Sequence, residues 1–246
     1  MPALLNQEGC FVLHKITVIA FDLDDTLWPC QPTIEYAEET LYLWLSDQYP
    51  RITERYSRDQ MLARRKHFMS ENPHYGINMS LMRHDFLRFL AIESDYDADI
   101  LDQQGFDVFF HARQQVTFYD DVMPSLERLK QQYRLGSISN GNASVEHVGL
   151  GHLFEHAVSA GDLNIAKPDQ RIFHHFAERF EAEPEQVLYV GDHPHYDVVA
   201  PEAAGMPSIW INRENQNWPK ELAEPRHQIS DLEELEALLL EAAGQN

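Results

Sequence analysis

Thr17-Val18-Ile19-Ala20-Phe21-Asp22-Leu23-Asp24-Asp25-Thr26-Leu27 decides the fold, because an unbroken apolar run leads directly into three carboxylates. A buried strand of a parallel sheet has such a continuous apolar run, and ligands bind beyond the carboxyl ends of these strands. Side chains two positions apart in an extended chain point the same way, so Asp22 and Asp24 begin on one side. A hard divalent cation such as Mg2+ prefers oxygen ligands of this kind. An acidic turn, with Asp25 and Thr26 as capping residues, is the plainer alternative.

A second polar cluster follows an apolar segment at 135–142. Ser139, Asn140 and Gly141 end this short predicted strand with a hydroxyl, an amide and a glycine. A hydroxyl donates a hydrogen bond to an anion, and glycine lets backbone N–H groups approach closely. These groups favour a phosphate-binding loop, although an ordinary Asn-Gly turn would have the same residues.

A third candidate is Lys167, which precedes Pro168 and a segment with helical spacing. The apolar positions of that segment are Ile172, Phe173, Phe176, Ala177 and Phe180. Proline is tolerated in the first turn of a helix, so we expect the lysine to lie near a helix start. There its ammonium group would neutralise a phosphate and the carboxylate that attacks it. A solvated surface lysine is the alternative.

The fourth cluster follows the apolar run at 187–190, which ends in Gly191 and Asp192, with Asp197 five positions later. Asp192 would complete a cation site begun by Asp22, and Asp197 would bind the cation through water or orient Asp192 and Lys167. Caps of the following helix are the alternative roles of both residues. His193 and His195 could indicate a transition-metal site. Loop histidines more commonly form hydrogen bonds or lie at the surface, and we predict such a role for them.

The four clusters together resemble the haloacid dehalogenase superfamily of hydrolases. The likeness rests on Asp22-x-Asp24-x-Thr26, Ser139-Asn140, Lys167-Pro168, and Gly191-Asp192 with Asp197, in this order and at strand ends. It implies an α/β fold with a doubly wound, Rossmann-like parallel-sheet core. It also implies Mg2+ as cofactor, with the nucleophile Asp22, the backbone carbonyl of Asp24, Asp192 and Asp197 around the metal. Asp24 would be the general acid/base, Lys167 would serve catalysis and substrate binding, and Ser139 and Asn140 would bind substrate.

Asp24 distinguishes the enzymatic alternatives that this likeness leaves open. A departing alkoxide needs a proton, whereas a departing halide does not, and the dehalogenases of the superfamily typically lack an acid two residues after the nucleophile. We therefore predict a phosphatase that acts through an aspartyl-phosphate, ahead of a 2-haloacid dehalogenase or a phosphomutase. A non-catalytic phosphate-binding protein is the remote alternative.

About 90 residues separate the first two clusters, far more than the 2 to 6 of a usual strand-to-helix connection. Helical spacing recurs within them, which predicts an inserted helical cap at 29–118 between core segments 1–28 and 119–246. The apolar sets are Ile34, Ala37, Leu41, Trp44 and Leu45; Leu81, Met82, Phe86, Phe89 and Leu90; and Phe106, Phe109 and Phe110. We expect a loop at 69–76. Arg83 interrupts one apolar stretch, so we predict that it binds substrate.

Composition restricts the partners. The chain has 246 residues, 43% of them hydrophobic, and a formal net charge of −21. This charge repels nucleic acid, so a phosphate substrate would be a small phosphorylated metabolite. No segment reaches the roughly 20 apolar residues of a membrane span, and we expect a cytoplasmic monomer or homodimer. Cys10 and Cys30 lack metal-ligand spacing, which predicts reduced thiols.

Three further segments extend the resemblance from the superfamily to one of its branches. They are Asn140-Gly141-Asn142-Ala143, the stretch at 149–154 and the stretch at 210–215. They look like a bacterial branch that includes flavin-pathway phosphatases. That likeness implies 5-amino-6-(5-phospho-D-ribitylamino)uracil or FMN, in riboflavin metabolism, as candidate substrates.

Overall fold

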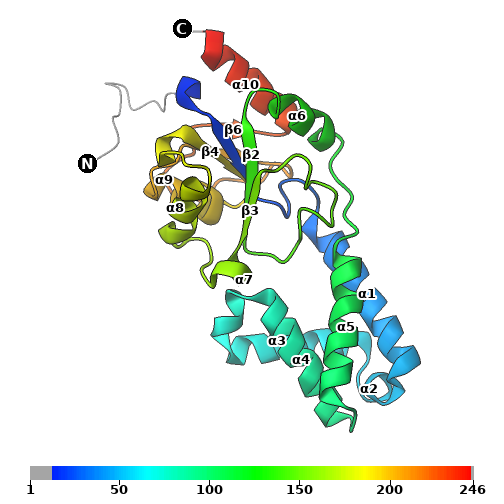
Figure 1. The fold of residues 1–246 in the computed structure, drawn as a ribbon. Helices are drawn as coiled ribbons and strands as arrows, with labels where there is room; N and C mark the ends of the chain where they lie inside the picture. The colour runs from blue at the N-terminus through cyan, green and yellow to red at the C-terminus, as the bar shows by residue number, and fades with distance from the viewer. Residues whose placement is uncertain (1–12, 245–246) are drawn as a thin grey trace.

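The structure, a computed structural model, describes residues 13–244 and contains a six-stranded sheet (Figure 1). The strand order is β3-β2-β1-β4-β5-β6, and every pair is parallel. The strands are β1 (Val18–Phe21), β2 (Arg134–Ser139), β3 (His156–Ser159), β4 (Val187–Gly191), β5 (Ser208–Ile211) and β6 (Gln228–Ile229). The predicted α/β fold class is confirmed. Cys10 lies outside the described residues.

Helices cover both faces of the sheet because the buried strands are apolar on both sides. On β1, Ile19 and Phe21 pack in the cluster that includes α6 (Val122–Leu129) and α10 (Leu232–Gly244). Val18 and Ala20 point to the opposite face, toward α8 (Gln170–Arg179) and α9 (Ala200–Ala203). One short helix, α7 (Ala160–Leu163), follows β3. Alternation along an extended strand explains this division into two cores.

Six α-helices lie between β1 and β2, and the first five of them form a separate body below the sheet in Figure 1. They are α1 (Cys30–Gln48), α2 (Pro50–Arg55), α3 (Arg58–Glu71), α4 (Met79–Glu93) and α5 (Ala98–Arg113). Their apolar faces enclose a third core, which includes Leu41, Phe86 and Phe109. The helical spacing predicted this cap, whereas its exact boundaries at 29 and 118 stay a prediction.

The expected loop at 69–76 is wrong in part. Helix α3 continues through Glu71, and a short 3-10 helix spans Pro73–Gly76. A capping box explains the start of α3, because Ser57 accepts from the N–H of Gln60 and Gln60 accepts from the N–H of Ser57. Within residues 13–244, no helix has the length and apolar character needed to cross a bilayer.

Strand β1 lies at the switch point of the sheet, between β2 and β4. Phe21 is in register with Ser137 on one side and Val190 on the other. The backbone N–H of Asp22 extends this ladder by donating to Val190 at 2.9 Å. The segments that follow these three strands therefore meet at one edge, where ligands bind in folds of this type.

Candidate active site

A buried ion cluster forms at this edge of the sheet. Lys167 Nζ donates to Asp22 Oδ1 at 2.7 Å, to Asp197 Oδ1 at 2.6 Å and to the Tyr189 hydroxyl at 2.9 Å. Lys167 is 5% exposed, Asp22 7% and Asp197 1%. Three of the predicted residues thus meet, although Asp22 and Lys167 alone are separated by 145 positions along the chain.

The electrostatics of this cluster show an excess of negative charge. Burial raises the pKa of Asp22, the ammonium of Lys167 offsets only part of this rise, and the carboxylates of Asp197 and Asp192 add to it. Burial, Asp197 and Asp25 raise the pKa of Asp192 to about 7. Burial opposes the charged form of Lys167, but its carboxylate partners raise its pKa and keep it protonated. One ammonium therefore faces three carboxylates, an arrangement that a cation would stabilise.

The carboxylates have the geometry of a candidate cation site. One oxygen from each of Asp22, Asp192 and Asp197 lies within 4.8 Å of the other two. The second oxygen of Asp197 accepts from the N–H of His193 at 2.9 Å, and Asp192 accepts from the Thr26 hydroxyl at 3.3 Å. All of these ligand atoms are oxygens, so the donor set fits a hard divalent ion.

The His193 ring does not take part in this cluster. Its Nδ1 accepts from the N–H groups of His195 and Tyr196, each at 3.2 Å, and so caps the helical turn Pro194–Val199. The hydrogen-bonding role predicted for the loop histidine is therefore observed. Its backbone contributes more directly, because it orients Asp197.

The carboxylate of Asp24 is bound separately from that of Asp22. Arg113 Nη2 donates to both of its oxygens at 2.7 Å, and Trp28 Nε1 donates to Oδ1 at 2.9 Å. The Asp24 side chain remains 21% exposed, whereas Arg113 is 1% exposed. Gly141 gives this carboxylate room, since a Cβ at that position would lie 2.8 Å from Asp24 Oδ2.

Ser139 and Asn140 differ in what they contact. The Ser139 hydroxyl accepts from the N–H of Gly141 at 3.0 Å and borders a cavity of about 500 Å³. Asn140 instead pairs with the backbone of Lys167: its amide donates to the carbonyl at 3.0 Å, and its oxygen accepts from the N–H at 2.8 Å. Asn140 thus holds the lysine segment in place, and Asp169 rather than Pro168 caps the helix that follows.

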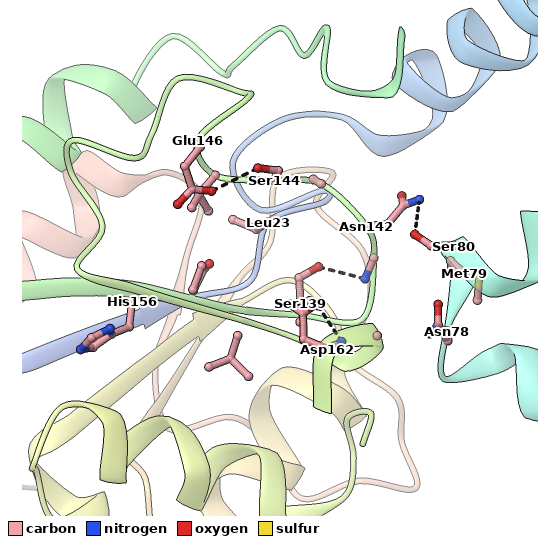
Figure 2. Close-up of a pocket in the computed structure, with 18 of the residues that line it drawn as sticks. Leu23, Asn78, Met79, Ser80, Ser139, Asn142, Ser144, Glu146, His156 and Asp162 are labelled. Atoms are coloured by element: carbon pink, nitrogen blue, oxygen red, sulfur yellow. Dashed lines mark hydrogen bonds between the residues drawn. The ribbon is translucent and has the colours of Figure 1, made fainter. Parts of the chain in front are cut away.

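The cavity lies between the core and the cap, as Figure 2 shows. Ser80 at the start of α4 accepts from the Asn142 side chain at 3.3 Å across this junction. Leu23, which separates Asp22 from Asp24, also borders the cavity. Asp22 and Lys167 are not among its lining residues, so the cavity adjoins the ion cluster rather than enclosing it.

A family model of the haloacid dehalogenase-like hydrolases matches residues 16–205, which is more than half of the chain. The chain belongs to this family. The match spans β1, the cap helices and the segments that carry Asp22, Ser139, Lys167 and Asp192, so the resemblance inferred from the motifs is confirmed.

Similar members of the family have different activities. The chain is 28% identical to the 5-amino-6-(5-phospho-D-ribitylamino)uracil phosphatase YigB of Escherichia coli, over 92% of this chain and 98% of that protein. It is also 28% identical to an (S)-2-haloacid dehalogenase of Pseudomonas putida, over 91% and 96%. A 2-haloacid dehalogenase structure from Pseudomonas syringae pv. Tomato is 35% identical with a TM-score of 0.84, over 92% and 99%. The hydrolase class is thus shared.

Arg83 lies away from the strand-end residues of this hydrolase. It is 3% exposed within the cap, donates to Glu38 Oε1 at 2.5 Å and lies over the Phe109 ring at 3.7 Å. Its substrate-binding role was inferred from a basic residue in an apolar stretch, and an internal ion pair accounts for that pattern. We therefore leave Arg83 out of the proposed site.

The hydrolase site also contains Arg113, Trp28 and Tyr189, which the motifs did not reveal. Tyr189 is fully buried, accepts from Lys167 and donates to the Ile138 carbonyl at 3.1 Å. A tyrosine within an otherwise aliphatic strand could have indicated a polar contact at this site, because a buried hydroxyl needs a hydrogen-bond partner. Arg113 gave no comparable indication, since it ends an ordinary amphipathic helix.

Proposed function

We propose that the chain is a Mg2+-dependent phosphatase that hydrolyses a small phosphomonoester through an aspartyl-phosphate on Asp22. The observation that carries this proposal is the second carboxylate, Asp24, which Arg113 and Trp28 hold beside the nucleophile's segment. An alkoxide leaving group needs an acid at this point, whereas a halide does not.

The residues divide the reaction into two steps. An Asp22 oxygen attacks phosphorus in line, and the ester P–O bond breaks as Asp24 gives its proton to the departing alkoxide. Asp24 then takes a proton from water, the water oxygen attacks phosphorus, and the bond to Asp22 breaks to release inorganic phosphate. Lys167 and Ser139 offset charge on the phosphoryl oxygens in both steps.

The carboxylates of Asp22, Asp192 and Asp197 would hold Mg2+, with Asp197 binding directly or through water, and the backbone carbonyl of Asp24 would add a further oxygen. The bound ion would lower the charge on the phosphoryl group. Its fit is supported by the all-oxygen donor set and by the surplus of carboxylates over ammonium groups.

We propose a polyhydroxylated phosphate ester as substrate, with 5-amino-6-(5-phospho-D-ribitylamino)uracil or FMN, intermediates of riboflavin metabolism, as the first candidates. Hydroxyl and amide groups border the cavity beside Ser139, namely those of Asn78, Ser80, Asn142, Ser144 and Ser159. Such groups suit a ribityl chain because each pairs with a neutral hydroxyl. The activity of the Escherichia coli relative, a 5-amino-6-(5-phospho-D-ribitylamino)uracil phosphatase, supports the same class.

A 2-haloacid dehalogenase is the second candidate, favoured by the structural relative at 35% identity. Its leaving halide needs no proton, so Asp24, held by Arg113 and Trp28, would have no role as an acid in that reaction. Arg113 offers the carboxylate of a haloacid no accessible donor, because it is 1% exposed and its Nη2 already binds Asp24.

The test measures two products from one enzyme preparation. Phosphate release is followed with the ribitylaminouracil phosphate, FMN, sugar phosphates and nucleoside monophosphates, with Mg2+ or EDTA, and halide release is followed with both enantiomers of a 2-halopropionate. We expect metal-dependent phosphate release and no halide. Halide release without phosphate release would reject the phosphatase and establish the second candidate.

A further inference from the structure

The cap contributes one side chain to the acid/base carboxylate of the core. Arg113 is the last residue of α5, and its Nη2 lies 2.7 Å from both oxygens of Asp24, 89 positions earlier in the chain. It is 1% exposed. A charge-assisted contact this short restricts the carboxylate to one orientation.

The hydrogen bonds recorded for the Arg113 guanidinium within residues 13–244 all go to Asp24. Its Nε and Nη1 are buried and have no partner among the described residues. Burying an arginine with two unpaired N–H groups costs free energy, and a helix can end without an arginine. The pairing with Asp24 is therefore the interaction that accounts for an arginine at this position.

Both connections between core and cap converge on the same carboxylate. Trp28, which precedes α1, donates to Asp24 Oδ1, and Arg113 approaches from the end of α5. The next residue, Gln114, binds the loop after β2: it accepts from the N–H of Ser144 at 2.8 Å and donates to the Asn142 carbonyl at 3.4 Å. The end of α5 thus contacts the acid/base and the phosphate-binding side of the cavity together.

We propose that Arg113 is a positioning residue for Asp24, which couples the placement of the cap to proton transfer in the core. The inference rests on the proposed phosphatase function. Arg113 orients the Asp24 carboxylate toward the leaving-group oxygen and the attacking water, and it acts on the reaction only through Asp24. A misplacement of about 1 Å in such a group lowers a rate by about 100-fold.

A double-mutant cycle tests this dependence. The variants are Arg113→Met, Asp24→Asn and the double variant, assayed for Mg2+-dependent phosphate release from the best alkyl phosphate of the wild type. We expect Arg113→Met to lower kcat by about 100-fold with KM nearly unchanged, because it misplaces the acid. In the Asp24→Asn background the same substitution should have no further effect, since the group that it positions is absent.

The leaving group gives a second readout that a structural role would not change. Para-nitrophenolate departs without protonation, so its release in the first turnover should be as fast in Arg113→Met as in the wild type. Arg113→Lys keeps one charged donor and should recover part of the alkyl-phosphate activity. Arg88, a half-buried arginine of α4 that pairs with Asp99 and Asp102, provides the control: Arg88→Met should leave every readout unchanged.

The outcomes separate the inference from the function on which it rests. Effects of the two single substitutions that multiply in the double variant would overturn the inference, because Arg113 would then act independently of Asp24. An equal loss with alkyl and aryl substrates in the first turnover would overturn it as well. Absence of metal-dependent phosphate release from the wild type would overturn the phosphatase function and the inference together.

Discussion

The core and the cap each bury an ion pair, and the two differ in how their charges balance. In the cap, burial acts against the ionised form of Glu38, but Arg83 and Arg65 overcome it and lower the pKa of this carboxyl. In the core, burial raises the pKa of Asp22, and the contact with Lys167 does not overcome it. Similar short contacts, 2.5 Å in the cap and 2.7 Å in the core, thus accompany opposite shifts.

The number of charges explains the difference. Glu38 faces two arginines, whereas Lys167 faces Asp22 and Asp197 with Asp192 nearby. The charge of Glu38 is balanced by its arginine partners, so this ion pair joins α1 to α4 without a further cation. A cluster with surplus carboxylates at the end of parallel strands would be stabilised by a cation or a proton, and it has the composition of a catalytic site.

The largest expected effect is on Asp22, the proposed nucleophile in the core cluster. Asp22→Asn should abolish phosphate release, because an amide cannot form the acyl phosphate. Asp107, an exposed residue of α5, supplies the control, and Asp107→Asn should retain wild-type turnover. Near-normal turnover of Asp22→Asn in the phosphate-release assay would remove the core cluster from the chemistry.

The next largest effect is on Lys167, the sole ammonium of the cluster. Lys167→Met should lower kcat by about 100-fold or more, because it removes a charge that stabilises the transition state. It should also cost about 3 to 5 kcal/mol of unfolding free energy in the metal-free protein, since two buried carboxylates lose their partner. Denaturant unfolding measures this cost. A variant with unchanged kcat would show that Lys167 has a structural role only.

The corresponding substitution in the cap should separate stability from catalysis. Arg83→Met leaves Glu38 with Arg65 alone, and we expect a loss of unfolding free energy below about 3 kcal/mol, less than for breaking an isolated buried pair. Its kcat/KM for phosphate release should match that of the wild type. A raised KM with unchanged unfolding free energy would instead place Arg83 in substrate recognition.

The last expected effect concerns pH and the metal. The folded pKa of Asp192, raised to about 7, exceeds the value of about 3.9 for an unfolded aspartate, so the folded protein binds this proton more tightly. In metal-free protein, the contribution of this group to stability is therefore present below about pH 4 and is lost as pH rises toward about 7.

Thermal unfolding checks this contribution. The Tm of metal-free wild type relative to Asp192→Asn should fall as pH rises across that window. Mg2+ should raise the wild-type Tm more above pH 7 than below it, because the ion binds the ionised carboxylate. A Tm difference between the two proteins that does not vary with pH would contradict the raised pKa.

The central strand and the carboxylates at its end could be predicted from sequence, because local patterns determine them. The run from Thr17 to Leu27 shows a buried strand and its terminal carboxylates, and parallel strands bring such ends to one edge. The partner of Arg83 could not be predicted, since Glu38 lies 45 positions away on another helix. The role of Arg113 could not be predicted either, because its contact with the distant Asp24 depends on how the cap packs against the core.

The most direct test of the core cluster is to identify the covalent intermediate. The wild type is mixed with Mg2+ and its best phosphate ester, quenched in acid during turnover and reduced with borohydride, which converts an aspartyl-phosphate to homoserine. Peptide mass spectrometry should find homoserine at position 22, and Asp24, Asp192 and Asp197 should remain aspartate. Turnover with unmodified Asp22, or with the modification at another carboxylate, would contradict the proposed site.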